Sequence, residues 1–278
     1  MFGFRKAKVQ PRAARPVPVI PTGKLIYAVG DIHGRADLLG QLLAMIDADV
    51  ERQGGTSRPG LIFLGDYIDR GGASNQVIDT LIAKQGDERY ETMALRGNHD
   101  QFLLDFLAQP VLGRSWINFG GAATLAAYGV TVPRVQTDEK AWVAAGQQLA
   151  AVIPKAHLDF IEATHFCATF GDYVFAHAGV RAGVKLEEQK LTDLLTIRDA
   201  FLASRDAVPG RVVVFGHTPF ERPLVEDDKI GIDTGACATG VLTALALLDD
   251  TRRFIQTGRG VSDVPPPIQK SADRPRRL

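Results

Sequence analysis

The chain has 278 residues, of which 45% are apolar and 23% charged, a composition typical of a soluble globular protein that can bury one large core. Its formal net charge is zero, but the first 24 residues and the stretch from Gly258 hold 11 of the 32 Lys and Arg and only 2 of the 32 Asp and Glu. The region between these ends therefore carries 9 more acids than bases, which argues against nucleic acid as the main ligand.

The cysteine content and the hydropathy pattern narrow the class of protein further. Only Cys167 and Cys237 are present, far apart in sequence, so neither a disulfide framework nor a thiolate zinc site is indicated. No apolar run approaches the roughly 20 residues that span a bilayer, and the N-terminus lacks the apolar segment of a signal peptide. We therefore expect a cytoplasmic protein with no membrane span, and the sequence indicates no oligomeric state.

Both ends of the chain are predicted to be disordered basic tails. Residues 1–23 are rich in Pro, Arg and Ala without periodicity, and residues 258–278 contain Pro265–Pro267 and several Arg. A short basic arm could contact acidic lipid or a partner, but a solvated terminus is the simpler interpretation. The folded domain is therefore expected over residues 24–257.

Strand-like and helix-like segments alternate in the first part of this domain. The strands end in Gly-Asp or Arg-Gly, and the first helix has an apolar stripe of Leu and Ile. Strand, turn and helix in succession predict a parallel or mixed sheet covered by helices, with ligands gathered beyond the carboxyl ends of the strands. The predicted elements are strands at 25–29, 61–64 and 92–95 and helices at about 36–53, 75–84 and 101–107.

The segment from about 111 to 164 breaks the alternation, and we interpret it as an inserted helical cap, with a helical stretch from Lys140 through Glu162. The second half is richer in strands, with apolar runs at 173–176, 212–215 and 240–248. Two sheets packed face to face would accommodate both halves. The predicted fold class is therefore α/β (α+β): a central β-sandwich of mixed sheets flanked by helices.

Five short motifs at the ends of predicted strands contain four of the six His residues. Asp and His suit Mn, Fe, Zn or Ni, and one carboxylate can bridge two ions roughly 3.5 to 4 Å apart. Glycines beside the ligand positions permit the sharp turns that such a site needs. The motifs are Gly30-Asp-Ile-His-Gly34, Gly65-Asp-Tyr-Ile-Asp-Arg-Gly71, Arg96-Gly-Asn-His-Asp100, His177-Ala-Gly179 and Gly216-His-Thr218.

In this order the motifs resemble the signature of the calcineurin-like metallophosphoesterases and, more narrowly, of the Ser/Thr phosphoprotein phosphatases, over about Ile26 to Leu248. Asp100 stands where eukaryotic members usually carry Glu, a change that keeps the charge. The resemblance implies two divalent metal ions, with Mn2+ expected first and Fe, Zn or Ni as alternatives. The implied ligands are Asp31 and His33 for the first ion, Asp66 for both, and Asn98, His177 and His217 for the second.

The resemblance also implies catalytic roles. His99 would be the general acid, poised by Asp69, while Arg70 and Arg96 would contact the phosphoryl oxygens, and Arg198 is a looser match to a further phosphate-binding Arg. From residue types alone, metal ions can lower the pKa of a bound water toward about 7, so no Ser or Cys nucleophile is required. Arg suits bidentate contacts to phosphate, and a cationic His can protonate a leaving alkoxide.

Several nearby residues stay outside the predicted site. His157 and His165 are expected to be surface or satisfied core histidines. Trp116 could shape the substrate mouth or simply pack before the Gly120-Gly121 turn. Asp233 could help to position His217, although a structural turn is the simpler interpretation.

The predicted function is a metal-dependent phosphatase that hydrolyses phosphomonoesters, such as phosphoserine or phosphothreonine in proteins, by direct attack of a metal-bridging hydroxide. The alternative is a symmetrical diadenosine tetraphosphate hydrolase or a related nucleotide phosphohydrolase. Such enzymes resemble this chain but usually read Ala-Arg-Gly where it has Asp69-Arg70-Gly71, which favours phosphomonoesters. A catalytically dead relative that binds phosphorylated partners is a second alternative, and the complete ligand set argues against it.

Overall fold

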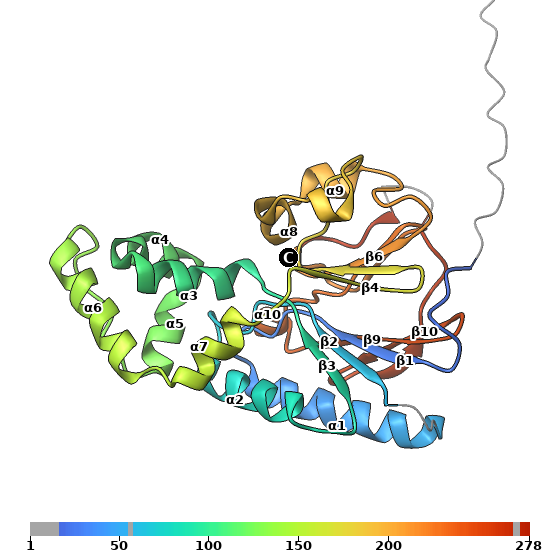
Figure 1. Cartoon of the computed structure of the whole chain (residues 1–278), viewed down its shortest axis with the longest axis horizontal. Helices are drawn as coiled ribbons and strands as arrows, with labels where there is room; N and C mark the ends of the chain where they lie inside the picture. The colour runs from blue at the N-terminus through green and yellow to red at the C-terminus, as the bar shows by residue number, and fades with distance from the viewer. Residues whose placement is uncertain (1–16, 55–57, 269–272) are drawn as a thin grey trace, which may run out of the picture.

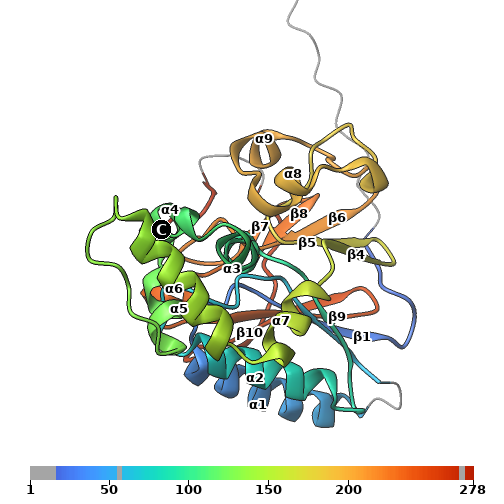
Figure 2. The same cartoon turned by 60° about the vertical axis from the view of Figure 1, so that its left-hand side comes forward.

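The computed structural model describes residues 17–54, 58–268 and 273–278 (Figure 1). Two mixed β-sheets pack face to face, with helices on their outer faces, which confirms the predicted fold class. One sheet has six strands in the order β11-β10-β9-β1-β2-β3, and the other has five in the order β4-β5-β6-β8-β7. In both views α1 and α2 cover the first sheet, and α8 and α9 cover the second (Figures 1 and 2).

The six-stranded sheet aligns the strand ends that carry three of the motifs. Its parallel part pairs Val29 with Phe63 and Phe63 with Ala94, so β1, β2 and β3 end side by side. The antiparallel part continues from β1 through β9. The strands are β1 Leu25–Val29, β2 Gly60–Phe63, β3 Glu91–Ala94, β9 Thr243–Leu248, β10 Thr251–Gln256 and β11 Gly260–Asp263.

The five-stranded sheet supplies the other two motifs. Its β5, β6 and β8 run parallel, so His177 follows the end of β5 and the Gly216-His217 pair follows the end of β6. The strands are β4 Cys167–Phe170, β5 Tyr173–Ala176, β6 Val212–Phe215, β7 Leu224–Val225 and β8 Lys229–Gly231.

The core follows from the two-residue period of the strands. Alternate residues of β1 face opposite ways: Ile26 packs with Phe175 and Val214 between the sheets, whereas Tyr27 packs under the leucines of α1. A strand that is apolar throughout is therefore buried on both faces. The predicted stripe of α1 is buried, at Leu38, Leu39, Leu42, Leu43 and Ile46.

The region between β3 and β4 forms a helical bundle beside the sandwich (Figure 2). The single helix predicted over 140–162 is two helices, because Pro154 lacks an N–H and disfavours helical geometry in the residue before it. The helices and 3₁₀ turns are α3 Asn98–Ala108, η1 Pro110–Leu112, α4 Gly113–Trp116, η2 Ile117–Phe119, α5 Gly121–Ala127, α6 Glu139–Val152 and α7 Lys155–Glu162.

The remaining helices are α1 Ala36–Gln53, α2 Ser74–Gln85, η3 Leu186–Glu188, α8 Leu191–Thr196, α9 Asp199–Ala203 and α10 Ala236–Thr239. Leu194 of α8 and Phe201 of α9 pack against Val213 of β6 and close the outer face of the second sheet. Within the described ranges, no helix is both long and apolar enough to cross a membrane.

The predicted tails lie partly outside the described residues, as residues 1–16 and 269–272 do. Where the C-terminal stretch is described, it differs from the predicted disorder. Residues 260–263 form β11 by pairing with the edge of β10, because backbone pairing at an edge does not require an apolar sequence. Arg274 lies 2.5 Å from Glu226 and Arg277 2.7 Å from Asp199. The acidic surplus of the domain thus supplies partners for the basic end.

Candidate metal and active site

Backbone strain is concentrated where the strand ends meet. The described chain has seven non-Gly residues with positive φ, and five of them are predicted site residues. The left-handed region costs such residues free energy, so it persists only where the surroundings fix it, often at functional sites. These five residues are His33, Asp66, Asp69, Arg70 and His217, with φ between 47° and 73°.

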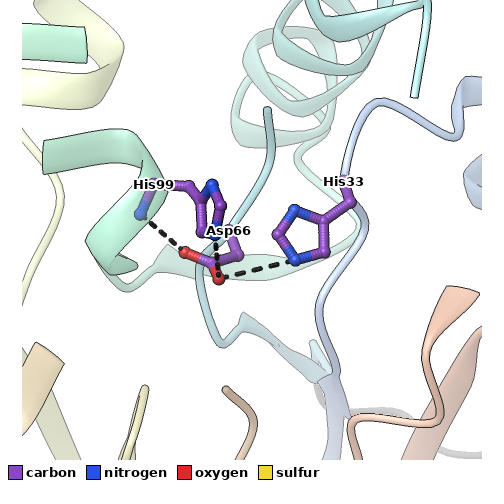
Figure 3. A group of neighbouring side chains, drawn as sticks. All are labelled: His33, Asp66 and His99. Atoms are coloured by element: carbon purple, nitrogen blue, oxygen red, sulfur yellow. Dashed lines mark hydrogen bonds and ion pairs between the residues drawn. The ribbon is translucent and has the colours of Figure 1, made fainter. Parts of the chain in front are cut away.

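The Asp66 carboxylate lies between two predicted sets of ligands. Its Oδ2 is 3.6 Å from Nε2 of His33, and its Oδ1 is 3.4 Å from Nε2 of His177. The backbone N–H of His99 donates to Oδ1 at 3.0 Å (Figure 3). One carboxylate from the loop after β2 therefore faces a histidine that follows a strand of each sheet, the position that a shared ligand requires.

Backbone carbonyls fix the tautomers of these two histidines. Nδ1 of His33 lies 2.9 Å from the carbonyl oxygen of Ile68, and Nδ1 of His177 lies 3.0 Å from that of Leu64. A carbonyl only accepts, so Nδ1 carries the proton and Nε2 keeps its lone pair. Burial lowers the pKa of His33 to about 3 and also lowers the pKa of His177, which favours the neutral, ligating form.

Several lone pairs in the site face one another, an arrangement that favours a bound cation. The lone pair of His177 Nε2 faces Oδ1 of Asp66 and, at 3.2 Å, Oδ1 of Asn98. Facing acceptors repel unless a cation lies between them. In the described part of the chain, two buried side-chain oxygens lack a hydrogen-bond partner, and one is Asp31 Oδ1. Burial, and then the charges of Asp233 and Asp66, raise the pKa of Asp31 well above its usual value.

Among the residues that the structure describes, two adjacent groups of side chains could each hold a metal ion, and Asp66 belongs to both. Within each group one ligand atom per residue lies within 4.8 Å of the others, and all the side chains are buried. Asp31 joins this cluster because its Oδ2 accepts the backbone N–H of His217 at 2.9 Å. The groups are His33, Asp66 and His99, and Asp66, His177 and His217.

His99 forms a dyad with Asp69. Its Nδ1 lies 2.7 Å from Oδ2 of Asp69, and both side chains are buried. Burial by itself lowers the pKa of His99, but the charge of Asp66 and the hydrogen bond to Asp69 outweigh it, so the pKa is raised. His99 can therefore carry a proton in the pH range where His33 and His177 are neutral.

Two of the three predicted arginines reach the site. Nη2 of Arg70 lies 3.2 Å from Nε2 of His99, and its backbone N–H donates to Gly120. Nε of Arg198 donates to Nε2 of His217 at 3.0 Å. Arg70 thus lies beside the dyad, and Arg198 lies beside a predicted ligand.

Arg96, predicted as a phosphate contact, makes its hydrogen bonds to the end of α7 in this structure. Its Nε donates to Oγ1 of Thr164 at 2.9 Å, and its Nη2 donates to the carbonyl oxygens of Ile161 and Glu162 at 2.7 and 2.9 Å. The last carbonyls of a helix have no partner within the helix. Arg96 donates to two of these carbonyls in α7, a structural role that the motif did not indicate.

Three residues near the site have roles that the motifs did not reveal. Asp100 accepts the backbone N–H groups of Asp66, Tyr67 and Gly97. Trp116 and Thr124 donate to Asp69. The buried indole N–H of Trp116 was a usable signal, because such a group needs an acceptor.

The remaining histidines and Asp233 lie outside the group of predicted ligands. His157 is buried between the hydroxyl of Tyr128 and the carboxylate of Asp79, while the side chain of His165 is exposed. Oδ1 of Asp233 accepts the N–H of Gly235, as in a turn. Its carboxyl adjoins Asp31, and burial raises its pKa to about 6.

Comparisons with known proteins agree with this geometry. A family model described as calcineurin-like phosphoesterase matches residues 24–233. The chain is 30% identical over 242 residues to the bis(5'-nucleosyl)-tetraphosphatase PrpE (asymmetrical) of Anoxybacillus flavithermus, across 80% of this chain and 90% of that protein. It is 29% identical over 221 residues to serine/threonine-protein phosphatase 1 of Salmonella typhimurium, across 78% and 89%.

A solved structure shows the same fold. The cold-active protein-tyrosine phosphatase of a psychrophilic Shewanella superposes with a TM-score of 0.59 at 15% identity, across 92% of this chain and 86% of that one. The matched residues include all five motifs, which confirms the resemblance inferred from the sequence. The chain therefore belongs to the calcineurin-like phosphoesterases, a family of phosphoester hydrolases.

Proposed function

We propose that this protein is a dinuclear metal-dependent phosphatase that hydrolyses phosphomonoesters, with phosphoserine and phosphothreonine in proteins as its substrates. The observation that carries the proposal is the His99–Asp69 dyad, 2.7 Å between Nδ1 and Oδ2, beside the Asp66 carboxylate. A serine or threonine alkoxide is a poor leaving group and needs a proton. An enzyme for such esters gains most from a general acid.

The metal ligands would be divided about Asp66. Asp31 and His33 would hold one ion with Asp66, and Asn98, His177 and His217 would hold the second with the same carboxylate. The unpartnered Asp31 oxygen and the facing acceptors at His177 support this assignment. When bound, two divalent cations polarise the phosphoryl group and supply a water of lowered pKa. Mn2+ is the first candidate, and Fe, Zn and Ni suit the same ligands.

Arg70 and Arg198 would hold the phosphoryl group in place. Their planar, permanently charged guanidinium groups suit bidentate contacts with phosphate oxygens. In the present structure Nη2 of Arg70 lies against Nε2 of His99. If Arg70 turned onto the phosphoryl oxygens, Nε2 of His99 would be free to face the leaving oxygen.

His99 would then protonate the leaving oxygen through Nε2. Asp69 accepts from Nδ1, which fixes the ring orientation and favours the cationic ring. Proton donation of this kind contributes about 100-fold to 10,000-fold in rate. The Ser or Thr hydroxyl leaves neutral, and His99 is left with its lone pair on Nε2.

A second candidate, a hydrolase of dinucleoside tetraphosphates, is favoured by one specific observation. The relative from Anoxybacillus flavithermus named for that activity matches most of this chain. A nucleotide leaving group is already a stable anion and needs less help from a general acid. The His99–Asp69 dyad therefore favours phosphomonoesters. The similarity to the tetraphosphatase supports dinucleoside tetraphosphates as the alternative substrates.

A substrate panel tests the proposal. Phosphoserine, phosphothreonine and phosphotyrosine peptides, p-nitrophenyl phosphate and diadenosine tetraphosphate would be compared by kcat/KM, each with Mn, Fe, Zn and Ni. We expect the phosphoserine or phosphothreonine peptides to exceed the dinucleotide by at least about 10-fold, a difference of roughly 1.4 kcal/mol in transition-state binding. A preference of that size for diadenosine tetraphosphate would overturn the proposal.

A further inference from the structure

The carboxylate of Asp69 is held by two side chains from the helical bundle. Its Oδ2 accepts from Nε1 of Trp116 at 2.7 Å, and its Oδ1 accepts from Oγ1 of Thr124 at 2.6 Å. Asp69, Trp116 and Thr124 are all fully buried. The same Oδ2 faces Nδ1 of His99. Each oxygen of this carboxylate thus accepts a hydrogen bond from the bundle. The Oδ2 atom also pairs with His99.

Thr124 holds the backbone of Asp69 as well as its side chain. The N–H of Asp69 donates to Oγ1 of Thr124 at 2.9 Å, and Oγ of Ser74 lies 3.1 Å from the same hydroxyl. A hydroxyl has one donor and two acceptor sites. All three are used when Thr124 donates to the carboxylate. This clamp stabilises Asp69 in the left-handed conformation, with φ of 73°.

The sequence around Trp116 suits this contact. The indole packs against Phe106, with the ring centroids 5.1 Å apart. A Cβ on Gly121 would lie 2.5 Å from the Trp116 ring, and a Cβ on Gly120 would lie 2.8 Å from the backbone nitrogen of Arg70. The glycine pair therefore lets the indole and the Arg70 loop approach closely enough for the hydrogen bond to Asp69.

We infer that Trp116 and Thr124 are positioning residues for the His99–Asp69 dyad, so that the helical bundle is a fixed part of the proton-donating apparatus. The inference rests on the proposed role of His99. The two donors hold the carboxylate plane so that Oδ2 faces Nδ1 of His99. In the described structure, the hydrogen bonds of both side chains go to Asp69 or Ser74 and to none of the predicted metal ligands.

The test separates donation of a proton from the rest of the reaction. Trp116→Phe removes the indole N–H and keeps an aromatic ring. We expect kcat for an alkyl phosphate or phosphoserine peptide to fall about 10-fold to 100-fold, the range typical of removing a hydrogen-bond partner that orients a metal-ligating histidine. With p-nitrophenyl phosphate, whose leaving group needs little protonation, kcat should change less than about 3-fold. KM and the metal content should be unchanged.

Thr124 provides an independent pair of variants. Thr124→Val removes the hydroxyl at nearly constant volume, and Thr124→Ser restores it. We expect Thr124→Val to show the same dependence on the leaving group as Trp116→Phe, and Thr124→Ser to recover kcat toward the parent value. This pair decides the question if Trp116→Phe fails to fold, as judged by circular dichroism.

Trp142→Phe is the matched control. Trp142 is also fully buried in the bundle, lies near the same Phe106 at 6.3 Å between centroids, and donates its Nε1 proton to the carbonyl of Gln136 at 3.0 Å. Its loss should lower thermal stability without changing the ratio of kcat between the two substrates.

Two outcomes overturn different claims. If His99→Ala shows no dependence on the leaving group, the proposed function of His99 fails, and the inference fails with it. If His99→Ala is selective for poor leaving groups but Trp116→Phe and Thr124→Val lower kcat equally for both substrates, the positioning inference alone is overturned. In that case the two residues only support the fold.

Discussion

The carboxylate of Asp100 accepts the backbone N–H of Asp66 at 2.9 Å, so a second buried carboxylate fixes the one that faces both predicted metal positions. Its oxygens also accept the N–H groups of Tyr67 at 3.0 Å and Gly97 at 2.9 Å. Asp100 thereby ties the loop after β2 to the start of α3. The position of Asp66 therefore depends on a carboxylate, Asp100, that belongs to a different motif.

Asp100→Asn replaces one accepting oxygen by a donor that faces backbone N–H groups. We expect this change to lower the free energy of unfolding by roughly 1 to 3 kcal/mol, the cost of leaving buried polar groups unpaired. Metal affinity should fall as well, because Asp66 is less well held. Urea denaturation and metal titration check both effects, and unchanged stability would contradict the assigned role.

Asp66→Asn tests the shared ligand. An amide offers one neutral oxygen where the carboxylate offers two charged ones, so we expect metal content and activity to be lost together. Elemental analysis of the purified variant, alongside kcat, provides the measurement. A variant that keeps two ions per chain would show that Asp66 is not shared.

His99→Ala separates the acid from the metals. We expect metal content to remain, while kcat falls about 100-fold to 10,000-fold for alkyl phosphates and much less for p-nitrophenyl phosphate. The kcat of the variant for each ester, together with elemental analysis, provides the check. Equal losses of turnover for the two kinds of ester would remove His99 from the acid role.

Arg96→Lys should mainly affect stability, whereas Arg70→Lys should mainly affect catalysis. Arg96 satisfies carbonyls at the end of α7, so its replacement should reduce the free energy of unfolding by roughly 1 to 3 kcal/mol and leave KM unchanged. Arg70→Lys should raise KM and lower kcat without a comparable loss of stability, because Lys cannot make a bidentate contact to phosphate. An increase in KM for Arg96→Lys would restore Arg96 to the phosphate site.

An ion pair away from the site, between buried Asp49 and partly exposed Arg253, makes stability depend on pH. Asp49 accepts from both terminal nitrogens of Arg253 and from the hydroxyl of Tyr27. Burial raises the pKa of Asp49, but these hydrogen bonds outweigh burial and the pKa lies below its usual value. The stabilisation is therefore complete above the unfolded-state pKa of about 3.9 and is lost as the pH falls through the folded-state value.

Asp49→Asn measures this contribution. The variant should lose roughly 1 to 3 kcal/mol of stability at pH 7, because the partly exposed Arg253 loses its charged hydrogen-bond partner. The difference from the parent should shrink below about pH 4, where the unfolded parent binds a proton at Asp49 that the folded parent does not yet bind. Urea denaturation at pH 7 and pH 3 checks this, and a difference that does not depend on pH would contradict the ion pair.

The fold could be predicted where local patterns determine it. The leucines of α1 recur with helical spacing, and the apolar runs of β1, β5 and β6 coincide with observed strands. The convergence of Asp66 with His177 followed from the rule that strand ends carry ligands. The break at Pro154 was readable from the same rules and was missed.

Long-range contacts could not be predicted from the motifs. A motif places the Cα of Arg96, but the carbonyls of α7 decide where its long side chain points. Trp116 and Thr124 lie 47 and 55 residues from Asp69 along the chain, and no periodicity links them. Likewise, β11 forms because the edge of β10 is open to it, a feature of the sheet rather than of residues 260–263.

Anomalous scattering from a crystal grown with manganese tests the central claim most directly. The account predicts two peaks roughly 3.5 to 4 Å apart, with the Asp66 carboxylate contacting both, Asp31 and His33 on one side and Asn98, His177 and His217 on the other. A single peak, or two ions with Asp66 bound to only one of them, would contradict it.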